Sequence, residues 1–390
     1  MTRVLYATEL CPCPPDGGSR IRARSLIRSL ALRYELHVLA GEGRPDERLA
    51  GLVRSWETWP ALPRGTFGDK VRFLRGLLRP RPEWSAFLEE RLRAVRPDAV
   101  WFDYGFWGQY EPIARAAGAR TIMGTHNAQS ELTRQECRAL PFGRSRLSRR
   151  LRLAVERRHE RRLFSRFDRI VSVSEEDRRS HARFAGDADS LLVPNYVWED
   201  DYAPEGVSRA DGLVIMTGDF TSFQNVRGAA WFLREVWGLV RRQAPGAFFE
   251  LAGRGSMHLP DLAACPPCVL PVGAVPRMAA NLQRAVVAVV PLLDGGGTRL
   301  KILEAIACGT PVVSTSLGAQ GLSIPPEEGI LIADAPADFA AAIVRLLRDP
   351  ALCASLSAQA LGILRRDHSD LANEARIRAA VEGPTAAGAA

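Results

Sequence analysis

The sequence predicts an α/β protein made of two Rossmann-like, doubly wound domains that face a central cleft. Short apolar segments, typical of buried parallel strands, alternate with amphipathic segments typical of helices. This alternation occurs twice, and an irregular stretch at 195–211 separates the two series. The length of 390 residues suits two or three domains. Ligands of such sheets bind at the carboxyl ends of the strands, so we expect the functional site there.

The first series supplies the amino-terminal domain. Its expected strands are Val4–Ala7, Leu36–Ala40, Ala99–Phe102, Thr121–Met123, Ile170–Val173 and Leu191–Val193. Helices are expected between them, among others at Ser19–Arg33, Glu83–Val95 and Pro112–Ala117.

The second series begins after the irregular stretch. Its expected strands are Leu213–Thr217, Phe248–Ala252, Val269–Val272, Val286–Pro291 and Pro311–Ser314. The expected helices are Val226–Gln243, Arg299–Cys308 and Ala335–Arg348. We therefore place a first domain at 1–204 and a second at 205–366, followed by a terminal helix at 367–382. The small-residue tail at 383–390 is expected to be disordered.

The composition is that of an ordinary soluble globular protein, with 46% apolar and 25% charged residues. No apolar run has the length of a membrane helix. Glu9 and Asp16 lie where a signal peptide would need an uncharged apolar core. We expect a cytoplasmic protein. Apart from Lys70, Lys301 and the histidines, all basic residues are arginine, which is typical of a GC-rich genome. We expect the source to be bacterial.

Two short motifs could suggest a metal site, but neither has the required context. Cys265-Pro-Pro-Cys268 has the spacing of a zinc half-site, yet no second pair follows it. Asp187-Ala-Asp189 precedes its strand, which puts it at the wrong edge of the sheet. We therefore expect no metal and no cofactor.

The strongest functional motif runs from Asp294 to Glu304. An expected strand ends at Pro291, a triple-glycine turn follows, and a helix opens near Thr298. Such a turn offers bare backbone N–H groups and the positive end of a helix dipole, the features of a phosphate-binding loop. Two cations, Arg299 and Lys301, stand in the first turn, where the helix dipole favours acidic residues, and an anionic ligand would offset this cost. Glu304, one turn later, could accept hydrogen bonds from ribose hydroxyls.

Two further segments lie at expected carboxyl edges. Gly17 and Gly18 allow close backbone approach of an anion at a helix start, although two glycines alone are weak grounds. His126 follows the strand Thr121–Met123. It either meets a ligand in the cleft or bonds a neighbouring carbonyl group, and the sequence alone favours neither interpretation.

The segment 144–169 contains eleven arginines against three acidic residues and so carries the whole net charge of +8. It predicts a basic amphipathic helix that packs on the first domain. Peripheral contact with anionic lipid is the next interpretation, and nucleic-acid binding is the least favoured. Because the apolar positions suit packing, any lipid contact should be electrostatic and sensitive to salt. These positions are Leu147, Leu151, Val155, Leu163 and Phe167.

The segment 295–315, Gly-Gly-Gly-Thr-Arg-Leu-Lys-Ile-Leu-Glu-Ala-Ile-Ala-Cys-Gly-Thr-Pro-Val-Val-Ser-Thr, resembles the signature of family 4 retaining glycosyltransferases with the GT-B fold. Asp16-Gly-Gly resembles the family's amino-terminal glycine loop, and His126-Asn127 resembles its cleft histidine. Leu251-Ala-Gly-Arg-Gly255 and Pro271-Val-Gly-Ala-Val275 match its nucleotide domain. The resemblance covers about residues 3 to 380.

The resemblance implies a retaining, metal-independent, hexosyltransferase-type enzyme. It would move a sugar from a nucleoside-diphosphate donor to a hydroxyl group of a polysaccharide, a lipid-linked glycan or a natural product. In this family the first domain binds the acceptor, the second binds the nucleotide sugar, and the terminal helix crosses back to the first. The protein would be cytoplasmic, with possible peripheral contact at the inner face of the membrane, and would bind no nucleic acid.

The resemblance also assigns roles to residues. His126 would face the transferred sugar, Arg299 and Lys301 would face the diphosphate, and Glu304 would face the ribose. The expected catalytic residues are His126, Arg299 and Lys301. Further donor-binding residues would be Gly17, Gly18, Gly253, Val275, Gly296, Gly297, Thr298 and Leu300, with Val275 near the base. Arg20 and Asn127 would lie on the acceptor side.

Two positions depart from the family pattern. Gly296 stands where the family often has the first glutamate of a Glu-x7-Glu pair, a residue that contacts the donor sugar. The segment Gly218–Asn225 has neither the arginine nor the lysine often found there, so Arg299 and Lys301 would replace them. The alternative function is that of a non-catalytic relative that binds nucleotide sugar or a partner protein.

Overall fold

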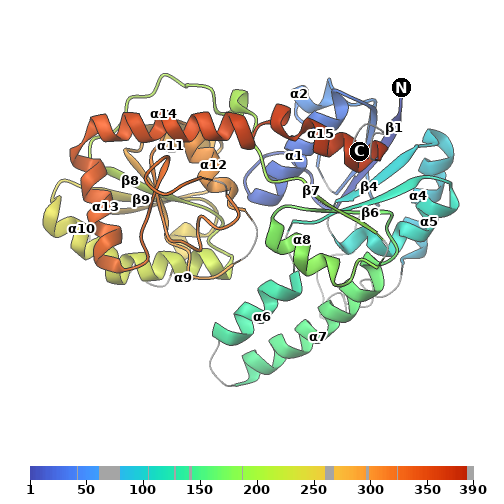
Figure 1. The fold of residues 1–390 in the computed structure, drawn as a ribbon, viewed down its shortest axis with the longest axis horizontal. Coiled ribbons are helices and arrows are strands. Elements are labelled where there is room, and N and C mark those ends of the chain that lie inside the picture. Colours follow the sequence, from blue (N-terminus) through green and yellow to red (C-terminus); the bar gives the residue numbers. More distant parts are fainter. Residues whose placement is uncertain are drawn as a thin grey trace, which may run out of the picture. The chain divides into compact units, whose positions relative to one another are not determined.

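The computed structural model describes residues 1–41, 43–60, 80–103, 105–126, 129–139, 143–186, 188–259, 268–295, 298–322 and 324–383. The chain forms two compact units (Figure 1). The first contains residues 1–15, 22–194 and 373–390, and the second contains 16–21 and 195–372. The segment 16–21 therefore belongs to the second unit although it lies near the amino terminus. Of the expected disordered tail, 384–390 lies outside the described residues.

The first unit is built on a parallel sheet in the order β3-β2-β1-β4-β5-β6-β7 among the described residues. Its strands are β1 (Arg3–Thr8), β2 (Glu35–Ala40), β3 (Ser55–Thr58), β4 (Ala99–Asp103), β5 (Arg120–Gly124), β6 (Arg169–Ser172) and β7 (Asp189–Leu192). Its helices are α1 (Gly18–Ala31), α2 (Glu47–Ala50), α4 (Pro82–Val95), α5 (Glu111–Ala116), α6 (Gln129–Ala139), α7 (Arg144–Phe164) and α8 (Glu175–Ala182). The first turn of α1 is part of the second unit.

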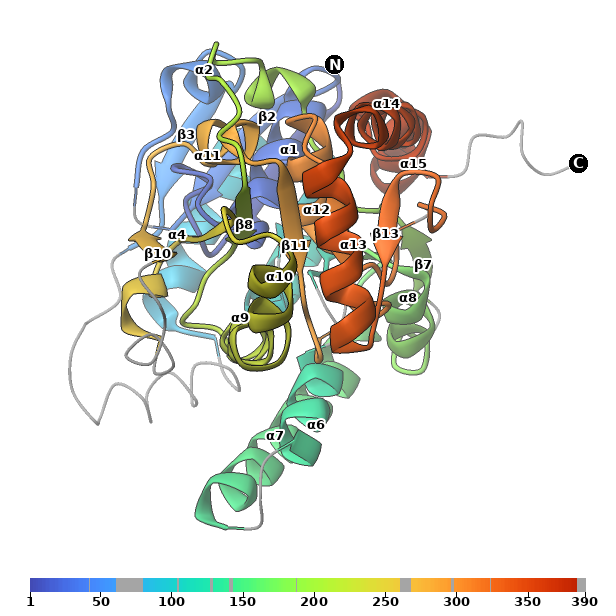
Figure 2. The ribbon, with the colours of Figure 1, turned by 90° about the vertical axis from the view of Figure 1, so that its left-hand side faces the viewer.

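Helices α6 and α7 form an antiparallel pair that contact each other along their length. Figure 2 shows this pair extending away from the sheet of the first unit. The carboxyl-terminal end of α7 packs back onto the unit, because Leu163 and Phe164 join the hydrophobic core beneath β4 and β5.

The second unit contains a parallel sheet in the order β10-β9-β8-β11-β12-β13 among the described residues. Its strands are β8 (Leu213–Thr217), β9 (Phe248–Ala252), β10 (Val269–Gly273), β11 (Val287–Val290), β12 (Val312–Ser314) and β13 (Ile330–Ile332). Its helices are α9 (Phe223–Trp231), α10 (Trp237–Gln243), α11 (Met278–Arg284), α12 (Leu300–Ala307), α13 (Pro336–Arg348) and α14 (Pro350–Asp367). The last helix, α15 (Asp370–Glu382), begins in this unit and continues in the first from Asn373 on.

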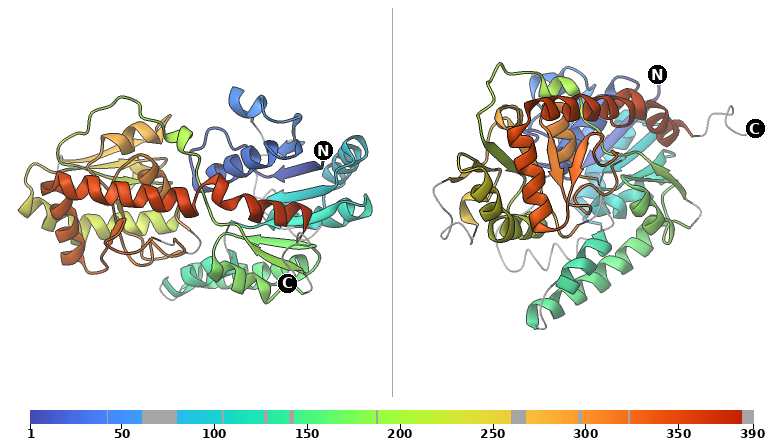
Figure 3. Two further views of the ribbon diagram at one scale, coloured as in Figure 1. Left: turned by 45° about the horizontal axis from the view of Figure 1, so that its top comes forward. Right: turned by 60° about the vertical axis from the view of Figure 1, so that its left-hand side comes forward.

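Alternating side chains of β8 build a core on each face of this sheet. Val214 and Met216 point to one face, which α9, α10 and α13 cover. Leu213 and Ile215 point to the other, which α11, α12 and α14 cover. Figure 3 shows helices on both faces of the sheet. This doubly wound arrangement is the one that the two series of apolar segments predict.

Both sheets reverse their strand order at one place. In the first unit β1 lies beside β4, and in the second β8 lies beside β11. The chain leaves the two adjacent strands toward opposite sides, which opens a crevice at their carboxyl ends. These two edges are therefore the places where a doubly wound sheet binds its ligands.

The structure differs from the sequence expectation in several elements. The strands β3 and β13 were not expected, and neither was the helix α14. The helix expected at 226–243 is interrupted by a π-helical turn at Phe232–Val236 between α9 and α10. Within that turn Phe232 packs on Phe249 with the ring centroids 4.6 Å apart, so the turn contributes to the aromatic core.

Candidate functional site

The loops after β8 and β11 meet at the strand-order reversal of the second unit. Lys301, in the first turn of α12, donates a hydrogen bond from Nζ to Asn225 Oδ1 of α9 at 2.7 Å. A Cβ atom at Gly218 would lie only 2.8 Å from this ammonium, so the glycine after β8 leaves the space that Lys301 occupies. A second link between these two segments is an ion pair between Arg227 of α9 and Asp294 in the loop after β11.

The electrostatics of Lys301 favour an anionic ligand. Burial and, less strongly, the positive charge of Arg299 together lower its pKa to about 7, while Glu304 acts in the opposite direction. The charged ammonium is therefore poorly stabilised by the protein alone. A bound anion would restore its charge, as expected of a group that contacts phosphate.

Glu304 lies one turn further along α12 and is buried, with 8% of its surface exposed. The hydroxyl group of Tyr202 donates a hydrogen bond to Glu304 Oε1 at 3.2 Å. Burial raises the pKa of Glu304 to about 7, against the opposing effects of Tyr202 and Lys301. The carboxyl group is thus held in place with one oxygen engaged, which leaves acceptor capacity for hydroxyl groups of a ligand.

Arg299 and Thr298 stand immediately before α12. The guanidinium group of Arg299 lies against Gly295, where a Cβ atom would clash with it, and the φ of +128° at Gly295 also requires glycine. The hydroxyl group of Thr298 is buried and makes no hydrogen bond to any residue in the described part of the chain. Gly296 and Gly297, the other two expected donor-binding glycines of this loop, lie outside the described residues.

The segment 16–21 brings a second helix start to this edge. Helix α1 begins at Gly18, and a Cβ atom at Gly18 would lie 3.6 Å from Leu300 Cδ1, at the first residue of α12. Ile21 joins the same apolar cluster as Leu300. Two residues separated by most of the sequence are therefore neighbours, and the amino-terminal ends of α1 and α12 lie close together.

Arg254, in the loop after β9, is a further cation that the sequence interpretation did not assign. It forms an ion pair with Asp219, the residue that follows Gly218. Burial alone would raise the pKa of Asp219, but the hydrogen bonds from Arg254 and Thr221 outweigh it and lower that pKa. The position of Arg254 directly after a strand, between two glycines, is the signal that could have identified it.

The remaining expected residues have different surroundings. A Cβ atom at Gly253 would lie 1.9 Å from the carbonyl oxygen of Gly218, so the close approach of two loop backbones requires this glycine. Val275 is partly buried between β10 and α11. Arg20 forms an ion pair with Asp16 at 3.4 Å. Asn127, the other expected acceptor-side residue, lies outside the described residues.

The strand-order reversal of the first unit also carries a polar cluster. His126 Nε2 lies 3.0 Å from Asp103 Oδ2, and both side chains are buried. Asp103 is the last residue of β4, and Glu9 directly follows β1. Burial raises the pKa of Glu9, and the nearby His126 partly counteracts this. The sequence left the partner of His126 open, and the structure brings the Asp103 carboxylate within hydrogen-bonding distance of it.

Two Rossmann-like units of this kind define the GT-B architecture of glycosyltransferases. The family model described as "Glycosyl transferase 4-like domain" matches residues 17–196, and the model described as "Glycosyl transferases group 1" matches residues 211–349. The two matches together span most of the chain. The chain therefore belongs to the group 1, family 4-like glycosyltransferases, and it is an enzyme that transfers a sugar to an acceptor.

Solved structures agree with this architecture. Sucrose-phosphate synthase from Thermosynechococcus elongatus has a TM-score of 0.73 at 17% identity, with 97% of each chain covered. HepE of Anabaena, solved in complex with UDP-glucose, has a TM-score of 0.68 at 13% identity, covering 97% of this chain and 98% of that one. The α,α-trehalose 6-phosphate synthase from Burkholderia multivorans has a TM-score of 0.64 at 13% identity, with 98% of each chain covered. A comparison with curated protein sequences gives no match.

Proposed function

We propose that the protein is a retaining, metal-independent glycosyltransferase that moves a hexose from a nucleoside-diphosphate donor to an acceptor hydroxyl group. The observation that carries this proposal is the Lys301–Asn225 hydrogen bond across the β8–β11 reversal, beside the starts of α1 and α12. A diphosphate is the anion that best fits a site with two helix starts and two cations.

The cations Arg299 and Lys301 would act on the leaving diphosphate. When the bond from the sugar to the diphosphate breaks, negative charge accumulates on the departing oxygen atoms. Cations and backbone N–H groups already fixed in position stabilise this charge more than they stabilise the intact donor, which lowers the barrier. A divalent ion would supply the same charge, so we propose that none is required. Gly17, Gly18, Thr298 and Leu300 would line the site without contributing charge.

The other expected roles are part of the same proposal. Glu304 would accept hydrogen bonds from ribose hydroxyls, which suits a carboxyl group already fixed by Tyr202. Val275 would lie near the base. His126 would contact the transferred sugar, with its ring orientation set by the carboxylate of Asp103.

The acceptor is proposed only as a class: a polysaccharide, a lipid-linked glycan or a small natural product. HepE was solved with UDP-glucose, which favours uridine diphosphate sugars for the first donor trials. None of the described helices has both the length and the apolar character needed to cross a membrane. We propose a cytoplasmic location, with peripheral contact at the inner face of the membrane.

A donor-consumption assay tests the function. UDP-, GDP- and ADP-sugars are incubated with the protein and an extract of its source as acceptor, with and without EDTA. Release of one nucleoside diphosphate that depends on the acceptor and survives EDTA supports the proposal. Loss of turnover in EDTA that manganese or magnesium restores would contradict metal independence. Donor binding without turnover under any condition would instead identify the non-catalytic alternative to which Gly296 points.

A further inference from the structure

Helix α7 separates its side chains into two faces of different chemistry. The inner face holds the buried Leu163 and Phe164 and both acidic residues of the helix. Glu160 is buried and accepts a hydrogen bond from the backbone N–H of Ser130 in α6 at 2.9 Å. Glu156 accepts one from Arg152 Nε at 2.6 Å. The acidic groups are therefore engaged within the α6–α7 pair.

The outer face begins with an exposed aliphatic stripe. Leu147, Leu151 and Val155 follow each other at intervals of four residues and are 61%, 64% and 38% exposed. This spacing places them on one side of the helix. The sequence interpretation expected these three residues to pack on the domain, and that expectation was wrong, because α7 projects from the unit and only its last turns reach the core (Figure 2).

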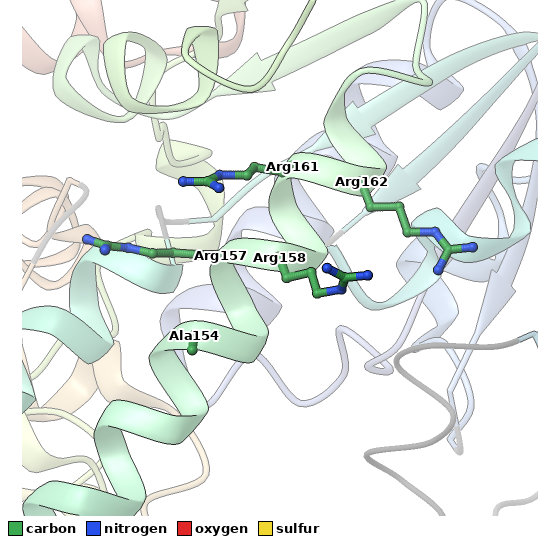
Figure 4. A pocket seen from close by; sticks show the side chains of 5 residues that line it. All are labelled: Ala154, Arg157, Arg158, Arg161 and Arg162. Atoms are coloured by element: carbon green, nitrogen blue, oxygen red, sulfur yellow. The ribbon is translucent and has the colours of Figure 1, made fainter.

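Arginines follow on the exposed sides of α7 toward its carboxyl end, and the helical spacing places Arg158 and Arg162 on the side of the aliphatic stripe. Arg157, Arg158, Arg161 and Arg162, together with Ala154, line an open pocket. Figure 4 shows Arg157 and Arg161 extending to one side of the helix, and Arg158 and Arg162 extending to the other. Since both acidic residues lie on the inner face, the charged side chains on the described outer face of α7 are all positive.

We propose that the outer face of α7 docks on an anionic lipid bilayer. The arginines would contact lipid headgroups, while Leu147, Leu151 and Val155 would insert among the upper acyl chains. A row of cations beside exposed aliphatic side chains is the pattern that binds in the interface of such a membrane. Phosphate groups of a nucleic acid would match the arginines but would leave the aliphatic stripe in water. A second copy of α7 would match the stripe but would place arginines against arginines.

This docking surface rests on the peripheral membrane contact of the proposed function and deepens it by naming the face that makes the contact. The donor site has no part in it, so failure of vesicle binding and failure of sugar transfer are separate outcomes. The proposed mode of contact is mixed, in place of the purely electrostatic one that the sequence led us to expect. Salt should weaken the arginine contribution by screening, whereas burial of the aliphatic side chains is not screened. Binding should therefore fall with salt without disappearing.

Co-sedimentation with vesicles tests the proposal. The probes are vesicles of phosphatidylcholine alone and of phosphatidylcholine with phosphatidylglycerol, each at low and high salt. The wild-type protein should sediment with the anionic vesicles and retain part of that binding at high salt. Arg158→Gln/Arg162→Gln should weaken binding at low salt by about thirtyfold. Leu147→Gln/Leu151→Gln should weaken it by about tenfold and should remove the part that survives high salt.

Matched controls use exposed residues on other elements. Leu32→Gln/Leu371→Gln changes two leucines that are 55% and 80% exposed. Arg183→Gln/Arg242→Gln removes two exposed arginines outside α7. Both control variants should bind as the wild-type protein does, and all variants should melt at its temperature. A wild-type protein that stays in the supernatant with anionic vesicles at low salt would overturn the proposal. So would α7 variants that bind as tightly as the controls, or tighter binding to duplex DNA than to vesicles.

Discussion

The Lys301 ammonium donates a hydrogen bond to Asn225 Oδ1 at 2.7 Å and thereby joins the two loops at the strand-order reversal of the second unit. The lysine is on α12, which follows β11, and the asparagine is on α9, which follows β8. An uncharged amide holds the ammonium in place but does not neutralise it. The pair therefore fixes the position of a cation while leaving its charge available to a ligand.

Replacement of Lys301 by methionine should stabilise the ligand-free protein. Lys301 has a folded-state pKa of about 7 against an ordinary value of 10.5, so its charge destabilises the folded state. This penalty is complete below pH 7 and declines as the pH rises toward the unfolded value. The melting temperature of Lys301→Met should exceed that of the wild type by about 2–4 °C per kcal/mol recovered, most of all below pH 7. Equal melting temperatures at pH 6 would show that the ammonium is well solvated.

Glu304→Gln should weaken nucleotide binding through the ribose. The amide keeps the size of the side chain but accepts hydrogen bonds less strongly than a carboxylate. The affinity for a nucleoside diphosphate should fall about tenfold. The affinity for inorganic diphosphate, which has no ribose, should fall far less. Calorimetry with both ligands separates the effects, and Tyr202→Phe serves as the control that removes only the 3.2 Å hydrogen bond to Glu304. An equal loss for both ligands would contradict the ribose assignment.

Arg254→Gln should weaken diphosphate binding even though the family signature does not include this residue. Its ion pair is with Asp219, the residue after Gly218, and Gly218 in turn borders the Lys301 ammonium. The loss of one partly exposed cation should reduce the affinity about threefold to tenfold. The matched control is Arg345→Gln, which removes an exposed arginine paired with Glu327 at 3.0 Å on a different part of the unit. If Arg254→Gln and Arg345→Gln bind the diphosphate with equal affinity, Arg254 has no part in the site.

Asp103→Asn should slow sugar transfer without weakening nucleotide binding. Asp103 holds His126 by a 3.0 Å contact in a buried site, and an asparagine would retain the shape but lose the charge. We expect kcat to fall about tenfold to a hundredfold, the effect of a lost charged hydrogen bond. The dissociation constant of the nucleoside diphosphate should stay unchanged. A fall in nucleotide affinity in step with kcat would indicate a general loss of structure instead of a loss of His126 orientation.

The doubly wound fold was predictable because buried parallel strands have a distinct apolar pattern. Strands such as Leu213–Thr217 and Phe248–Ala252 appear in the structure with the bounds that the sequence predicts. β13 was missed because Ile330–Ile332 is a short apolar run directly after a segment rich in proline, glycine and acidic residues, a composition typical of a loop. Helix α14 was missed because its alanines and serines blur the apolar period that identifies a helix.

The site was predictable where one motif contains both the loop and the charges. Arg299, Lys301 and Glu304 lie within one segment, so the sequence indicates their proximity directly. Asn225 and Arg254 could not be found in this way, because only the strand order brings the ends of β8, β9 and β11 together. The exposure of Leu147 and Leu151 was also unpredictable, since helical spacing shows that they share a face but not what covers it.

Calorimetric titration of the wild-type protein and of Lys301→Met with UDP, GDP and ADP tests the central claim most directly. The claim is that the edge between β8 and β11 holds the diphosphate of the donor. The wild type should bind at least one of the three nucleotides, and Lys301→Met should bind the same nucleotide about ten- to a hundredfold more weakly. The claim would be contradicted if the two proteins bound the nucleotide with equal affinity, or if the wild type bound none of the three nucleotides.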